Sequence, residues 1–118
     1  MINIQERWAL FIDFAATLHE LLTDAKQELE QARLIETVPL FVLQRLDRHW
    51  QRICRDLDTF TEVSKGIQKD THLTQSQINT AVNVIAKINE AARQADASLR
   101  LFSQEKGVEL NPPPDKFQ

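Results

Sequence analysis

The chain has 118 residues, of which 42% are hydrophobic and 26% charged, and it contains only two glycines. This composition fits one globular domain and excludes a disordered or collagen-like chain. The single cysteine rules out a disulfide within the chain, and the formal net charge of -3 argues against a generally basic nucleic-acid-binding protein. No segment has the roughly 20 uninterrupted apolar residues of a membrane-spanning helix, so we expect a soluble, cytoplasmic protein.

The first segment is predicted to be a long amphipathic helix over about residues 3–35. Asn3 followed by Glu6 has the spacing of a capping box at its start. Core-type residues then recur at alternating gaps of four and three, which is the heptad period of packed helices. They are Ile4, Trp8, Phe11, Ala15, Leu18, Leu22, Ala25, Leu29 and Ala32.

The second segment repeats the pattern and predicts a helix over about residues 38–68. Pro39 suits the first helical turn, because its missing N–H would have no partner there in any case. One core position of this series is polar. The series is Leu43, Leu46, Trp50, Ile53, Leu57, Phe60, Ser64 and Ile67.

The third segment predicts a helix over about residues 74–106. Thr74 and Gln77 form a second capping box, flanked by Leu73 and Ile78 as a hydrophobic staple. Gly107 can end the helix, and the following Pro112–Pro114 run prevents its continuation. The core series is Ile78, Ala81, Ile85, Ile88, Ala92, Ala95, Leu99 and Phe102.

These elements predict an all-α fold, an antiparallel three-helix bundle with long, coiled-coil-like helices over residues 1–106. Residues 107–118 are expected to form an extended or partly disordered proline-rich tail. If the helices fold back at the predicted turns, Trp50 lies level with Ala25 and Ala92. Large residues of the second helix then face alanines of its neighbours, which fills the core without voids.

Three apolar residues, Leu10, Phe41 and Leu101, project to the outer side in this register. Two interpretations are open. The tail can fold over the end that holds Phe41 and Leu101 through Val108 and Leu110, or the exposed residues can mark a homo-oligomer contact. We expect a homo-oligomer.

An arginine row on the second helix is the most distinctive surface feature, with members spaced three, four and three apart: Arg45, Arg48, Arg52 and Arg55. The core register turns this row away from the bundle. It can be a solvated face with Arg52–Asp56 and Arg55–Asp58 pairs, a dock for an acidic protein partner, or a grip on nucleic-acid phosphates.

Catalytic and metal motifs are mostly missing: the sequence has no zinc or di-iron ligand pattern and no glycine-rich phosphate loop. Sequence alone leaves a nucleophilic triad open, but the short loops offer no obvious cleft, so we expect no enzyme activity and no cofactor. His49 followed three positions later by Arg52 matches two elements of a histidine-phosphotransfer site, but Ile53 stands where such a site has glycine. The sequence therefore favours a small protein-protein interaction module, such as an adaptor, regulator, inhibitor or chaperone-like protein. A nucleic-acid-associated bundle is the alternative, and phosphotransfer at His49 is a remote one.

Overall fold

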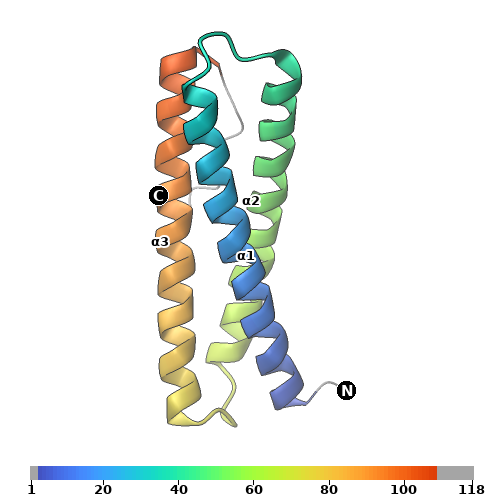
Figure 1. Ribbon diagram of the computed structural model, residues 1–118. Coiled ribbons are helices and arrows are strands. Elements are labelled where there is room, and N and C mark those ends of the chain that lie inside the picture. Colours follow the sequence, from blue (N-terminus) through green and yellow to red (C-terminus); the bar gives the residue numbers. More distant parts are fainter. Residues whose placement is uncertain (1–2, 109–118) are drawn as a thin grey trace.

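The computed structural model describes residues 3–108. Within this range the chain forms three helices, α1 (Ile4–Arg33), α2 (Leu40–Gln68) and α3 (Gln75–Lys106), and no strand. They make an elongated bundle of 53 × 24 × 21 Å in which α1 runs antiparallel to α2 and parallel to α3 (Figure 1). The all-α three-helix bundle predicted from the heptads is thereby confirmed. Most of the predicted tail, residues 109–118, lies outside the described residues.

The helices begin and end where the local capping chemistry places them. The Asn3 side chain accepts a hydrogen bond from the Glu6 backbone at 2.8 Å, Thr74 and Gln77 make both bonds of a capping box, and Gly107 ends α3 with a left-handed φ of 65°. The predicted start of α2 is wrong by two residues. Pro39, which the sequence places in the first helical turn, is the N-cap, with ψ at 150°. The residue before it, Val38, stays outside the helix, because a proline disfavours helical backbone in its predecessor.

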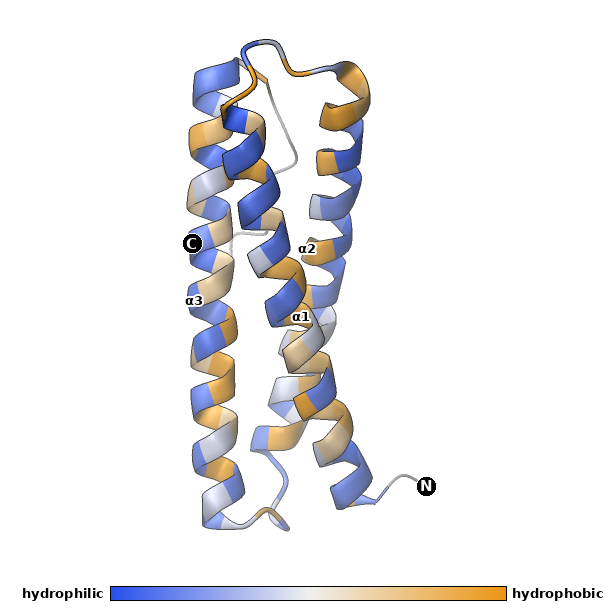
Figure 2. Cartoon of the chain, viewed as in Figure 1, coloured by the Kyte–Doolittle hydropathy of each residue, from blue (hydrophilic) through white to orange (hydrophobic). Residues whose placement is uncertain are grey.

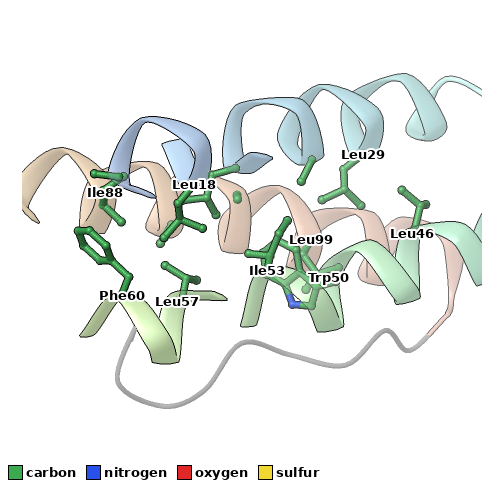
Figure 3. Close-up of a cluster of buried hydrophobic side chains, with 14 of the residues drawn as sticks. Leu18, Leu29, Leu46, Trp50, Ile53, Leu57, Phe60, Ile88 and Leu99 are labelled. Carbon is green, nitrogen blue, oxygen red and sulfur yellow. The ribbon is translucent and has the colours of Figure 1, made fainter. Parts of the chain in front are cut away.

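Side-chain size divides the core between the helices. Every buried residue of α2 except Ser64 is large, whereas three of the seven buried residues of α1 and three of the seven of α3 are alanines. Small side chains let two helix axes approach closely. Accordingly α1 and α3 pack most extensively, α2 packs against α1, and α2 and α3 touch each other least. The shared core lies between all three helices, as the hydrophobic side chains in Figure 3 show.

Aromatic residues fill the α1–α2 seam. Phe60 stacks on Phe11 and Phe14, with ring centroids 5.7 and 6.1 Å apart. Trp50 is 2% exposed and lies near Leu99 (Figure 3). Ala25 and Trp50 line the same small gap in the core, which agrees with the predicted position of Trp50 opposite Ala25. The indole N–H of Trp50 is buried and has no hydrogen-bond partner among the described residues.

Two core predictions need correction. Ile78 was expected in the core but is 39% exposed, because it lies in the first turn of α3, at the end of the bundle, where fewer neighbours surround it. Asp96, which belongs to no predicted core series, is buried. One of its carboxylate oxygens accepts from Arg100 Nε at 2.9 Å, while the other has no partner among the described residues.

Polar contacts fasten both ends of α1 to other parts of the chain. At the C-terminal end, Arg33 makes two hydrogen bonds to Glu105 of α3, at 2.7 and 2.8 Å. At the N-terminal end, Arg7 pairs with Asp70 in the α2–α3 connection. The His72 backbone N–H also donates to Asp70, at 2.8 Å, and this bond is the main cause that lowers the pKa of Asp70.

Trp50→Ala is expected to lower the free energy of unfolding by roughly 3–5 kcal/mol, because it empties the space between α1 and α3 that the ring fills. Urea denaturation of the two proteins measures this difference. Val82→Ala, at a position that is 53% exposed, is the matched control and should change stability by less than about 0.5 kcal/mol. A wild-type midpoint for Trp50→Ala would contradict the packing described above.

The Asp70 carboxylate should stabilise the fold above the ordinary aspartate pKa of 3.8, and this contribution should disappear as the pH falls through the lower folded-state value. We therefore expect the gap in urea midpoint between wild type and Asp70→Asn to be wider near pH 6 than near pH 2.5. The exposed Asp13→Asn serves as control. A gap independent of pH would show that the Asp70 carboxylate does not stabilise the fold.

Candidate functional site

The arginine face of α2 consists of Arg45, Arg48, Arg52 and Arg55, and all four side chains are exposed. Arg48 Nε donates to the Gln44 carbonyl at 3.4 Å, and Arg52 lies 3.8 Å from its expected partner Asp56. Arg45 and Arg55 form no ion pair within residues 3–108. The guanidinium groups of this face are therefore exposed, and within the described part of the chain those of Arg45 and Arg55 have no ion-pair partner.

The expected Arg55–Asp58 pair is not formed within residues 3–108. Asp58 lies instead on the flank of α2 that faces α3. Burial is the largest cause that raises the pKa of the nearby Cys54 thiol to about 11. The negative charges of Asp58 and Asp96 raise it further. Such a thiol stays protonated near neutral pH and is a weak nucleophile.

Exposed apolar residues gather at both ends of the rod. The end that holds the α1–α2 connection exposes Leu34 (87%), Leu40 (69%) and Phe41 (67%), and Figure 2 shows the hydrophobic colouring of this region. The other end exposes Leu10, as the sequence predicts. Leu101 is 40% exposed, and Val108 packs against the core. Leu110 lies outside the described residues, so covering of this end by the tail stays a prediction.

The α1–α3 groove, which the sequence analysis missed, is a hollow of about 850 Å³ between the two parallel helices. Short or apolar side chains that are buried or half-buried form its floor: Ile12, Ala15, Leu22, Ile88 and Ala91. Long polar side chains form its rim, namely Lys26, Gln27, Glu30, Lys87, Glu90 and Gln94. An apolar floor with a polar rim is the usual composition of a binding groove.

The rim is partly tied together by its own contacts. Lys26 Nζ reaches across the groove to Gln94 Oε1 at 3.3 Å, and Glu90 accepts from Arg93 at 2.6 Å. The bond from Arg93 is the main cause that lowers the pKa of Glu90. Lys87 forms no ion pair with any residue from 3 to 108, so it is the rim cation that a ligand meets without breaking an existing pair.

A sequence signal for this groove did exist. Beside the core series of α1 runs a second series with the same alternating gaps, Ile12, Ala16, His19, Thr23, Lys26 and Glu30, and α3 has its counterpart in Val84, Lys87, Ala91 and Gln94. Both mix small, apolar and polar residues. Without the packing arrangement, each is indistinguishable from the flank of an ordinary amphipathic helix.

The histidines do not form a catalytic group with the cysteine. His49 Nδ1 lies 3.2 Å from Glu28 Oε2 across the α1–α2 line, while His19 lines the groove. The described residues contain no group of three potential metal ligands and no helix long and apolar enough to cross a membrane. Two surfaces of the described residues are the candidates for binding that we consider first, the arginine face and the α1–α3 groove.

Replacing Arg48 and Arg52 together by glutamine should change the free energy of unfolding by less than about 0.5 kcal/mol per site, because both side chains are exposed and their contacts are weak. Thermal and urea denaturation of dilute protein measure this. Unfolding of the double variant would mean that the arginine face stabilises the bundle and is not free to bind.

Comparisons with protein-family models, with curated proteins and with solved structures find no match to this chain. The function therefore has to be inferred from the chain's own residues. Of its two candidate surfaces, the α1–α3 groove is the one with a defined cavity.

Proposed function

We propose that the protein is a non-enzymatic binding module that takes an amphipathic helix of a partner protein into the α1–α3 groove. The single observation that supports this most is the groove itself, whose apolar floor and polar rim extend along two parallel helices. Helix-in-groove recognition requires such a floor for the apolar side of the incoming helix.

The length of the groove suits a helix of several turns. Its lining on α1 extends from Ile12 to Glu30, and at 1.5 Å per residue this span is about 27 Å. A helix of roughly 18 residues covers that distance. Its apolar side chains would recur at i, i+3, i+4 and i+7. The small residues Ala16 and Ala91 of the groove leave room for such side chains.

The rim adds a preference in charge. Lys87 is unpaired among the described residues, whereas Glu90 already holds Arg93. A partner helix with an acidic residue beside its apolar stripe would therefore gain a charge-assisted contact with Lys87. We place this activity in the cytoplasm, because a chain with one cysteine does not depend on an internal disulfide for its fold.

Selection of helical peptides from a random amphipathic library against the purified protein tests this proposal. We expect selected peptides to shift the NMR signals of Ala16, Thr23, Val84 and Ala91. Filling the groove with Ala16→Arg and Ala91→Arg should weaken the binding of these peptides at least about tenfold, because the long arginine side chains occupy the space that the peptide needs.

Ala97→Arg is the matched control, since Ala97 is an exposed alanine of α3 that does not line the groove. It should bind the peptides like the wild type. Peptides that bind the groove-filled variant with unchanged affinity, or a library that gives no binder, would contradict the proposal.

A further inference from the structure

One long face of the rod carries opposite charges on its two helices. On α1 an exposed series with gaps of three and four contains the acidic residues Asp13, Glu20 and Asp24. On α2 the arginine face is an exposed series of the same kind. Both series lie on the outer sides of their helices, separate from the flank of α1 that lines the groove and from the flank of α2 that carries Cys54.

The two charged series are level with each other. Glu28 meets His49 at 3.2 Å, and Arg7 pairs with Asp70, which fixes how residues of α1 and α2 correspond along the rod. Counting inward from these contacts places Arg55 about 3 Å from the level of Glu20, and Arg52 about 1.5 Å from the level of Asp24.

Apolar residues lie near both ends of this face. By the same count, Leu34 lies about 3 Å from the level of Phe41 near one end, and Leu10 lies about 6 Å from the level of Val63 near the other. All four are exposed, at 87%, 67%, 57% and 36%. The face, here called the α1–α2 face, thus has apolar ends and a charged middle.

We propose that the α1–α2 face binds the same face of a second copy of this chain in a parallel, two-fold symmetric dimer. A two-fold axis along the rod sets α1 of each copy opposite α2 of the other at the same level. Glu20 and Asp24 then meet Arg55 and Arg52 of the second copy, and Leu34 meets Phe41 of the second copy. Every contact is made twice.

The charges also select the orientation. A two-fold axis across the rod would set α1 against α1, with the acidic series facing each other, and like charges across an interface are costly. The rod is 53 Å long and 24 Å wide, so one long face is larger than the roughly 800 Å² per partner that a stable interface buries. In the parallel dimer, opposite charges face each other at similar positions along the rod, and the shared face is large enough for a stable interface.

Two oppositely altered chains test the proposal by sedimentation equilibrium. The first carries Arg52→Glu and Arg55→Glu, which make the face acidic, and the second carries Glu20→Lys and Asp24→Lys, which make it basic. Wild type should give twice the chain mass of 13.6 kDa at micromolar concentration. Each altered chain alone should dimerise at least about 100-fold more weakly, whereas their mixture should form a heterodimer.

The relative orientation is tested by disulfide trapping in a Cys54→Ser background. Thr17 and Thr59 are exposed, lie on the two series and are level with each other. A mixture of Thr17→Cys and Thr59→Cys chains should form a mixed disulfide under mild oxidation. A mixture of Ala97→Cys and Thr59→Cys chains, with Ala97 on the outer side of α3, should not.

Circular dichroism first confirms that each altered chain is folded. A monomeric wild type at 100 µM, or altered chains that each dimerise as well as the wild type, would overturn the proposal. Binding of generic duplex DNA by a monomeric wild type, steeply salt-dependent and lost in Arg52→Glu, Arg55→Glu, would assign the arginines to phosphates instead. Peptide binding in the α1–α3 groove is measured separately, so this proposal and the proposed function can fail independently.

Discussion

The close packing of α1 against α3 is the constraint on which the rest of the structure depends. It rests on alanines at buried positions of both helices, because a small side chain leaves the two backbones free to approach. The remaining helix, α2, then has to supply most of the side-chain volume of the core. The large residues of α2, with Trp50 and Phe60 foremost, meet that need, and few contacts remain between α2 and α3.

Small side chains on α1 and α3 also produce the α1–α3 groove. Two helices that meet through small residues leave a hollow on their outer side, provided that the flanking positions are also small. Ala16, Thr23 and Ala91 are such small flanking residues, and longer lysine and glutamate side chains form the rim around them. The proposed binding site is therefore a direct consequence of how the core is packed and requires no loop or insertion.

The charged residues make two kinds of contact within the described chain. Ion pairs such as Arg33–Glu105 and Arg7–Asp70 join separate parts of the chain and fix its ends. Among residues 3–108, the contacts of the arginine face are those of Arg48 with the Gln44 carbonyl and of Arg52 with Asp56, both within α2. Exposed pairs of that kind contribute little to stability, which is compatible with the proposed role of these arginines between two copies of the chain.

The sequence by itself determined the number of helices, their core faces and most of their ends, since heptad spacing, caps and prolines act locally. It also placed Trp50 opposite Ala25, because antiparallel helices joined by short turns have a fixed register. Only the tertiary structure decided which helix pair packs closest, and with it the α1–α3 groove and the burial of Asp96. Those features depend on the relative placement of residues far apart in the chain, such as Ala16 and Ala91, about which the pattern along one helix carries no information.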